Sequence, residues 1–298
     1  MRNNLFKIFF IFIILCTNSF AKEFEFKTSE IKILENGDLV KATNGKAISS
    51  DNNIEVEASN FEYVKSKNIL KAFNGLAFIK ADNIQIEFEE ITIDQKKFLV
   101  STKNKTIITD LNEKLVLQSN TINYDRNKKN LSSDYKSSLK DRFGNSFAME
   151  SFNYDKMKNI LKVENLILND FENKKFKADI AFINTKSKKL FGKDIEINLN
   201  NKSFNKDNEP RLKGRTVIND NNFTEVGKGI FTTCKRRDKC PPWQLSAEKI
   251  KHDKKKEIIS YNNAKLKIYD IPVFYFPKFF HPDPTVKRKS GFLIPALK

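Results

Sequence analysis

The feature that most constrains this chain is a hydrophobic pattern of period two that continues through most of its length. Apolar and polar residues alternate in segments such as 54–58, 84–88 and 195–199. Successive side chains of a β-strand point to opposite faces, so these segments place one row of side chains inward and one outward. No segment after residue 21 has the apolar period of an amphipathic helix. We therefore predict an all-β protein.

The alternating segments also recur at a nearly constant spacing. A three-residue step, apolar at its first position and apolar or aromatic at its third, returns every 28 to 31 residues, ending at Ile33, Tyr63, Ile93, Tyr124, Tyr154 and Phe182. Polar turns such as 94–97, 125–128 and 155–158 follow these steps. Asp and Asn favour such turns because their side chains bond nearby amides and they tolerate left-handed backbone angles. The repeat predicts stacked rungs that form an elongated body with a continuous apolar interior.

Alternation alone is compatible with two forms of that interior. If the rungs close, the interior is an ordinary core and the protein is a structural β-solenoid. If two sheet walls stay open along one edge, the interior is a trough that can hold acyl chains. The candidates for lipid contact in such a trough are the aromatic residues of the inward rows, with core packing as the default for each: Phe61, Tyr63, Phe88, Tyr124, Tyr154 and Phe182.

The regular period ends near residue 200. The stretch from Asn200 to Arg215 is polar and contains Pro210 and Gly214, so we expect a linker or a long turn there. A last copy of the step is expected at 250–252, with residues 253–256 as its turn.

The N-terminus has the order of a secretory signal peptide. Arg2 and Lys7 precede an apolar run at 8–15, and small residues at Ser19 and Ala21 predict cleavage after residue 21. The run is about half of the ~20 residues that a transmembrane helix needs. Cys16 falls within the segment that would be removed, and Leu15 before it is too large for a lipoprotein processing site.

The chain is strongly basic. Its formal charge is +17, and removing Arg2 and Lys7 leaves +15. Such a surface favours anionic partners, among them nucleic acid, acidic lipid and phosphorylated glycolipid. Export argues against nucleic acid, and the abundance of Lys and Asn along the whole chain is an alternative source of the charge.

Two cysteines follow residue 21, Cys234 and Cys240. In an oxidising exported compartment they are disulfide candidates, with each other or with partners elsewhere. A zinc site with His252 as third ligand is less favoured, because the spacer is long and no fourth ligand is evident. No metal or other cofactor is expected.

The C-terminal part has a distinct composition and carries specific motifs. Trp243 lies within PPWQLSAEKI, followed by NAKLKIYDIPVFYFPKF and then by HPDPTVKRKSGFLIP. These segments resemble the outer-membrane lipopolysaccharide-assembly proteins of the organic-solvent-tolerance (OstA-like) family. The upstream repeat is similar to that family's periplasmic β-jellyroll, an open trough.

The resemblance implies three parts: a signal peptide at 1–21, a jellyroll at 22–215, and at 216–298 a cysteine-containing junction with the first strands of an incomplete outer-membrane β-barrel. It implies that the chain is an N-terminal portion, located in the cell outer membrane but mainly periplasmic. Its implied function is lipopolysaccharide transport: the trough receives lipopolysaccharide and passes it to a laterally opening barrel.

The resemblance also implies partners and residue roles. A periplasmic jellyroll bridge protein (LptA-like) would add a strand near Phe24–Leu34, and an outer-membrane lipoprotein plug (LptE-like) would fill a complete barrel. Cys234 and Cys240 stand where the family has cysteines that pair with others near the barrel's C-terminus. Pro272 and Pro277 stand where prolines are thought to ease the lateral gate, whereas a simple bend between short strands is the alternative.

Two other classes of function remain as alternatives. The first is a self-contained soluble periplasmic module that binds or bridges lipid without a barrel, which reading the DNA beyond Lys298 would test. The second is an enzyme, which we do not expect, because the sequence has no G-x-S-x-G, H-E-x-x-H or P-loop motif and only His252 and His281 as imidazoles.

Overall fold

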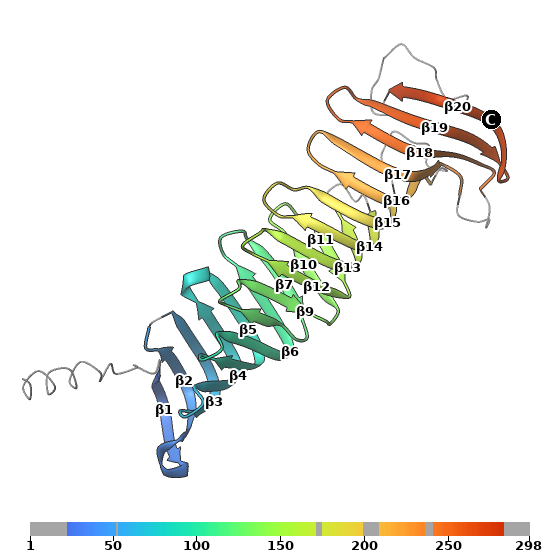
Figure 1. The fold of residues 1–298 in the computed structure, drawn as a ribbon. Coiled ribbons are helices and arrows are strands. Elements are labelled where there is room, and N and C mark those ends of the chain that lie inside the picture. The colour runs from blue at the N-terminus through green and yellow to red at the C-terminus, as the bar shows by residue number, and fades with distance from the viewer. Residues whose placement is uncertain (1–22, 52, 171–174, 199–208, 236–240, 283–298) are drawn as a thin grey trace, which may run out of the picture.

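The protein is a long stack of antiparallel β-strands (Figure 1). A computed structural model describes residues 23–51, 53–170, 175–198, 209–235 and 241–282. Within these ranges there is no α-helix, and the only helical turns are two short 3-10 segments, η1 (Glu35–Gly37) and η2 (Lys80–Asp82). The prediction of an all-β, jellyroll-like fold with stacked rungs is confirmed. The signal peptide expected at 1–21 lies outside the described residues.

The strands fall into three sets. The first six are β1 (Phe24–Leu34), β2 (Leu39–Ser49), β3 (Ile54–Val64), β4 (Ile69–Ile79), β5 (Ile84–Asp94) and β6 (Leu99–Asp110). Shorter ones follow: β7 (Leu115–Ser119), β8 (Asn123–Asp125), β9 (Asn130–Ser133), β10 (Ser137–Lys140), β11 (Ser146–Met149) and β12 (Ser151–Asp155). The last eight are β13 (Ile160–Asn169), β14 (Lys175–Asn184), β15 (Leu190–Asn198), β16 (Arg211–Asn219), β17 (Phe223–Thr232), β18 (Trp243–Asp253), β19 (Ile258–Ile268) and β20 (Ile271–Pro282).

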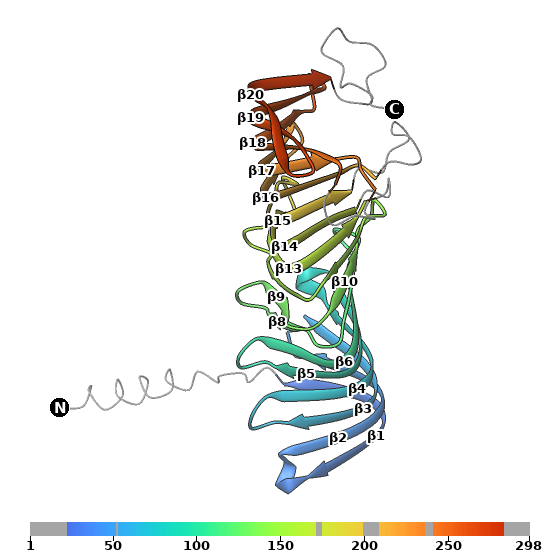
Figure 2. The ribbon, with the colours of Figure 1, turned by 90° about the vertical axis from the view of Figure 1, so that its right-hand side faces the viewer.

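Each long strand pairs with the next, from β1 to β6 and again from β13 to β20. Alternate strands carry a residue with left-handed backbone angles at their midpoint, and these residues are Asn44, Asn74, Asn104, Asn165, Asp194, Lys228 and Asn263. The ladder skips a pair beside them, as between Thr43 and Gly45. Each strand therefore bends at its middle, so the sheet has two walls that meet along a spine of bends (Figure 2).

The chemistry of the bend is local. Asn adopts left-handed angles more readily than most residues, because its short polar side chain can bond to nearby backbone. Gly45 and Gly75 follow two of these asparagines, and a Cβ on Gly75 would lie 2.0 Å from the carbonyl oxygen of Glu57. Only glycine permits that close approach between neighbouring strands.

Four-residue turns close one edge of the stack. Asp94, Asp125, Asp155 and Asp253 each accept a bond from the amide three residues later, at 2.9 to 3.0 Å. The turns also bond to one another: the amides of residues 65, 95, 126, 156 and 185 donate to carbonyls of the preceding rung's turn. The predicted Asp and Asn turn chemistry is confirmed, including the last copy at 253–256.

In the middle of the stack the bend becomes a break. The first residues of β6 pair with β8, and its last residues pair with β7. Likewise, the first residues of β13 pair with β12, and its last residues pair with β11. The pairings β7–β10–β11 and β8–β9–β12 connect them, so eight strands form a closed ring. Here the two walls are separate ladders joined only at β6 and β13.

The sheet continues through the region expected to be a linker. Residues 211–215 belong to β16, which pairs with β15 and β17, so the expected linker is wrong for them, while 199–208 lie outside the described residues. Arg211 and Leu212 could not be identified as strand residues because their polar context hides the alternation. The expected domain boundary at 215/216 falls inside this strand.

Candidate functional site

A single apolar core runs between the walls from Phe24 on β1 to Ala264 on β19. Phe61, Tyr63, Phe88 and Tyr124 lie in it, each at most 5% exposed. At the N-terminal end the core joins the two walls directly, since the ring of Phe24 lies 5.6 Å from that of Tyr63. The interior is therefore filled by side chains along its length.

The remaining two lipid-contact candidates differ from these four. Tyr154 packs against the core and is partly buried. Phe182 points to the outer face, 39% exposed, and pairs there with Phe191 at 6.5 Å between ring centroids. Its neighbour Ala181 occupies the inward position. The expectation that Phe182 points inward is therefore wrong. Leu161, the partner of Tyr154, pairs with Ile183, so the inward row of β14 passes through Ala181 and Ile183, and Phe182 between them faces outward.

The inward tyrosines place their hydroxyl groups near the edges of the walls. The hydroxyl of Tyr63 donates to Oδ1 of Asn68 at 2.6 Å, and that of Tyr124 donates to Oδ2 of Asp82 at 2.6 Å. Burial raises the pKa of Tyr63 to about 12, and burial together with Asp82 raises the pKa of Tyr124. Both side chains stay neutral near pH 7, so the interior remains apolar with polar groups only at its margin.

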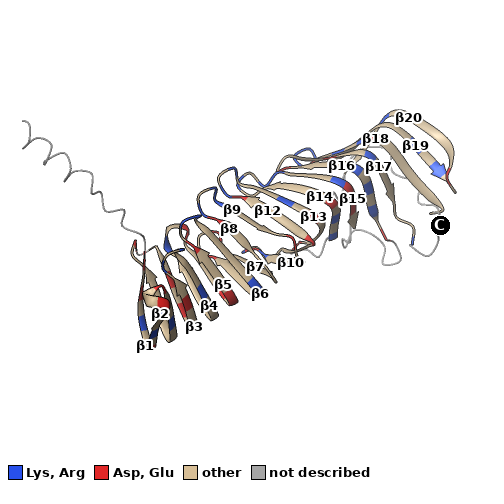
Figure 3. Cartoon of the chain, turned by 60° about the horizontal axis from the view of Figure 1, so that its bottom comes forward, with Lys and Arg blue, Asp and Glu red and all other residues tan. Residues whose placement is uncertain are grey.

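The two edges of the stack differ in charge. We call the turns at 65–68, 95–98, 126–129, 156–159 and 185–189 the turn edge, and the loops at 50–53, 80–83, 111–114 and 141–145 the loop edge. The loop edge mixes both signs. Figure 3 shows the basic residues along the turns. Basic residues outnumber acidic ones at the turn edge: Asp94, Asp125 and Asp155 directly before three of the turns pair with Lys97, Lys128 and Lys158. The turns themselves hold twelve basic residues: Lys65, Lys67, Lys96, Lys97, Arg126, Lys128, Lys129, Lys156, Lys158, Lys186, Lys188 and Lys189.

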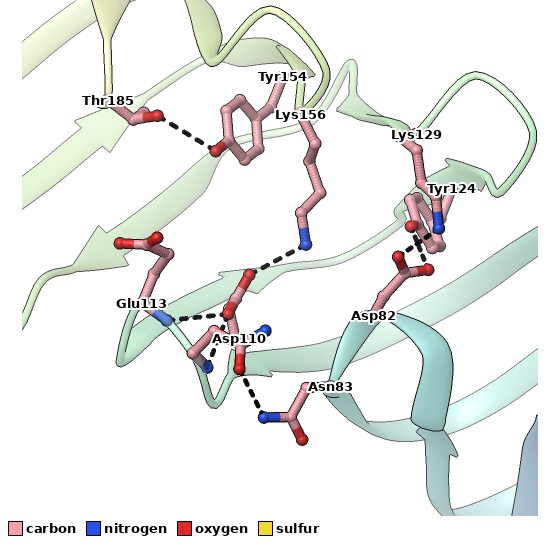
Figure 4. A network of polar contacts seen from close by, with 10 residues as sticks. Asp82, Asn83, Asp110, Glu113, Tyr124, Lys129, Tyr154, Lys156 and Thr185 are labelled. Carbon is pink, nitrogen blue, oxygen red and sulfur yellow. Dashed lines mark hydrogen bonds and ion pairs between the residues drawn. The ribbon is translucent and has the colours of Figure 1, made fainter. Parts of the chain in front are cut away.

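The edges meet in the middle of the stack (Figure 4). Lys129 on the turn edge pairs with Oδ1 of Asp82 beside the loop edge, on the carboxylate that Tyr124 also contacts. Lys156 pairs with Oδ2 of Asp110 at 3.1 Å. We call this line of contact, with Gln95 and Arg126 beside it, the seam.

Sequence reasoning did not find the seam. Its partners are 42 to 47 residues apart in the chain, which no local pattern connects. The usable signal was the recurrence of an acidic residue at Asp51, Asp82 and Asp110, opposite basic residues that recur with a similar period.

In the C-terminal hairpin of β19 and β20, the last strand exposes apolar side chains on both of its faces. Ile271, Val273, Phe274, Tyr275 and Phe280 on β20 are all exposed. The hairpin contains the segment NAKLKIYDIPVFYFPKF, where the sequence predicts a strand pair.

Both prolines of β20 lie at irregular points of its ladder. Pro272 sits beside a register shift at Leu266 and Lys267, and Pro277 sits opposite the left-handed bend at Asn263. Proline lacks an amide hydrogen, so these are positions where the ladder loses least. Their placement fits the simple bend between short strands. Their role in a lateral gate stays a prediction.

Of the two cysteines expected to form disulfides, only Cys234 is described. It is partly buried, with Sγ 3.7 Å from the carbonyl oxygen of Trp243. Cys240 lies outside the described residues, so the pairing stays a prediction. Among the residues that the structure describes, no three His, Cys, Asp or Glu side chains gather as a metal site.

At the other end of the stack, β1 pairs only with β2 among the described strands, and its second half exposes Ile31, Ile33 and Leu34. The strand has the bounds expected for a docking edge. An unpaired edge with apolar side chains is suited to strand addition from another chain. Within the described residues, no helix is long and apolar enough to cross a membrane.

These features define a class of protein: an elongated two-walled β-jellyroll with an apolar interior, a basic edge and an unpaired strand at each described end. Comparison with known proteins shows which proteins this chain is similar to. The chain is similar to "LPS-assembly protein LptD" from Shewanella frigidimarina (44% identity over 80 residues), Sodalis glossinidius (38% over 79) and Haemophilus influenzae (31% over 115). These matches confirm the resemblance seen in the sequence.

The matches cover part of each protein. The three span 26 to 36% of this chain and only 10 to 14% of the length of the relatives. No family model matches the chain. The relatives are named as assembly proteins and not as enzymes.

Proposed function

We propose that this chain carries lipopolysaccharide, with the acyl chains between the two walls and the phosphorylated sugars at the turn edge. The observation that supports this best is the single apolar core that continues from β1 to β19 without interruption. Acyl chains need such a path through water, because each exposed methylene costs about 0.8 kcal/mol. The similarity to LptD proteins points to the same ligand.

The direction of transport follows from the two ends of the stack. In this proposal a jellyroll bridge protein (LptA-like) adds a strand to β1 and delivers lipopolysaccharide there. The lipid then moves toward the exposed apolar residues of β20, where a laterally opening barrel with its lipoprotein plug (LptE-like) receives it in the outer membrane. Since β1 exposes aliphatic residues and β20 exposes aromatic ones, the two ends suit different partners.

Photo-crosslinking in cells tests the ligand. A photoreactive phenylalanine analogue placed at Tyr63, Phe88 or Tyr154 should yield lipopolysaccharide adducts, whereas at Phe182 it should not. Phe182 is a matched control, since it is an aromatic residue of the same repeat on the outer face. Absence of adducts at all three inward positions, with the chain folded, would overturn the proposal.

A second function has one observation in its favour. The interior aromatic residues are almost completely buried, with Phe61 and Tyr63 each 1% exposed, as expected for a structural β-solenoid whose core is only a core. The crosslinking experiment separates the two, because a solenoid gives no lipid adduct from any position.

The prolines provide a further test of the handover step. Changing Pro272 and Pro277 to Ala restores two amide donors to β20 and should slow the appearance of lipopolysaccharide at the cell surface. Unchanged surface lipopolysaccharide would favour the simple bend.

A further inference from the structure

The seam is the weakest connection between the two walls. At the spine, the polypeptide chain joins the walls covalently, through bent strands or, between β6 and β13, through the short connections between strands. At the seam, only side chains meet. No backbone hydrogen bond between described residues crosses from the turn edge to the loop edge. A hinge at the spine could therefore open the interior by separating a few side-chain pairs while every ladder stays intact.

The pairs that hold the seam are the shielded ones. The side chains of Lys129 and Asp82 are 36% and 9% exposed, and those of Lys156 and Asp110 are 21% and 12% exposed. In the pair of Lys41 and Glu62, within one wall, they are 47% and 40% exposed. Charge-assisted bonds shielded from water are stronger than surface pairs, which contribute little. The seam is thus a defined closure and not a chance surface contact.

The closed seam leaves polar atoms without partners. Both polar atoms of the Gln95 side chain are buried and unbonded in the described structure, and so is Nε of Arg126. These residues, with Lys156, occupy the first position of successive turns and form one column along the seam. Buried polar atoms without partners are costly, so this column favours a state in which a polar group reaches it.

If the walls separate, the basic and acidic residues of the seam stay on opposite edges. Arg126, Lys129 and Lys156 stay with the turn edge, and Asp82 and Asp110 stay with the loop edge. Arginine and lysine bind phosphate with the same charge-assisted bonds that they make to a carboxylate. A phosphate arriving at the seam can therefore replace the two aspartates.

We propose that the seam is a gate along the interior, and that a phosphorylated amphiphile arriving from β1 opens it by exchanging its phosphate for Asp82 and Asp110 on Arg126, Lys129 and Lys156. The acyl chain then enters between the walls, while the phosphate stays at the turn edge. This inference rests on the proposed function, because it requires an interior that accepts acyl chains.

The first test measures access to the interior in the purified whole chain with N-phenyl-1-naphthylamine, an apolar dye without charge. Asp82→Asn together with Asp110→Asn weakens both pairs and should speed dye uptake roughly tenfold. The matched control Glu62→Gln removes an exposed pair within one wall and should leave uptake unchanged. Equal uptake by the seam variant and the unaltered chain would overturn the gate.

A charge-swap variant distinguishes loss of the ion pair from unfolding of the chain. Asp110→Lys combined with Lys156→Asp keeps an ion pair in reversed order and should restore slow uptake relative to Asp110→Lys alone. If the swap takes up dye as fast as the single variant while both remain folded by circular dichroism, the pair does not close the seam.

The second test concerns the phosphate. Oleoyl lysophosphatidic acid and monoolein have the same acyl chain, and only the first carries a phosphate. The unaltered chain should prefer the phosphorylated lipid, and Lys129→Met with Lys156→Met should reduce that preference about tenfold while speeding dye uptake. An unchanged preference would overturn the exchange.

The two proposals fail in different ways. Absence of lipopolysaccharide crosslinking at all three of Tyr63, Phe88 and Tyr154 would overturn the proposed function. Retained crosslinking, combined with dye uptake that ignores the seam, would overturn only the gate.

Discussion

The rungs of β2 to β6 and the hairpin of β19 and β20 use the same bent strands with opposite results. In the first region each of β2 to β5 has a neighbour of similar length on both sides, and its inward row is almost completely buried. In the second, β20 has one described neighbour and exposes most of its apolar residues. The comparison indicates that burial in this fold comes from stacking rather than from the single rung, as expected for repeat proteins.

The largest expected effect tests that difference directly. Phe61→Ala empties a site in the stacked region, where the side chain is 1% exposed, and should lower the free energy of unfolding by about 3–5 kcal/mol. Phe274→Ala in the hairpin removes a side chain that is 62% exposed and should change it by less than ~0.5 kcal/mol. Urea unfolding followed by circular dichroism measures both. Similar losses would mean that β20 is stabilised by contacts comparable to those of the rungs.

The second largest effect on the free energy of unfolding is expected at the bends of the strands. Gly75→Ala forces a Cβ against the carbonyl of Glu57, 2.0 Å away, and should cost about 1–3 kcal/mol. Asn74→Gly is the matched control, because glycine accepts the left-handed angles of that position and should cost only a few tenths of a kcal/mol. Asn263→Gly repeats the control at the bend of β19. A large loss for either asparagine variant would show that its side chain, and not its backbone angle, makes the bend.

Much of this architecture could be predicted because it depends on local chemistry. The bounds of β1 and the turn after β18 follow from alternation and from Asp and Asn in turns. The break of the strands between β6 and β13 could not be predicted, because it depends on how one rung bends against the next. The seam was missed for a related reason: Lys156 and Asp110 are 46 residues apart and meet only after the walls have folded onto each other.

A smaller effect compares the buried tyrosines of the two regions at high pH. Burial raises the pKa of Tyr63 to about 12 and also raises the pKa of Tyr261, which bonds to His281 at 3.0 Å. A raised folded-state pKa gives stability that is complete below about pH 10, the unfolded value, and is lost as the pH rises through the folded value. Tyr63→Phe and Tyr261→Phe should each flatten the loss of stability between about pH 10 and 12.

Two probes separate the regions in that experiment. Trp243, the only tryptophan, reports on β18 beside the hairpin, while circular dichroism reports on the whole sheet. If the stack unfolds as one unit, both variants flatten both signals equally. If Tyr261→Phe alters only the fluorescence, the C-terminal strands unfold separately from the rungs.

The smallest expected effect concerns the turns that the two regions share. Backbone amides of the turn lower the pKa of Asp155 after β12 and of Asp253 after β18. A lowered pKa gives stability that is present above about pH 3.8 and is lost as the pH falls through the folded value. Asp155→Asn and Asp253→Asn keep an oxygen acceptor but remove the charge, so each should lower the urea midpoint slightly at pH 7, and the difference from the unaltered chain should disappear as the pH falls through the folded-state pKa. Since both carboxylates are on the surface, the two shifts should be small and alike. A larger shift for Asp155 would mean that a turn between stacked rungs depends more on its cap than the turn before the hairpin does, which would extend the difference between the regions from their cores to their edges.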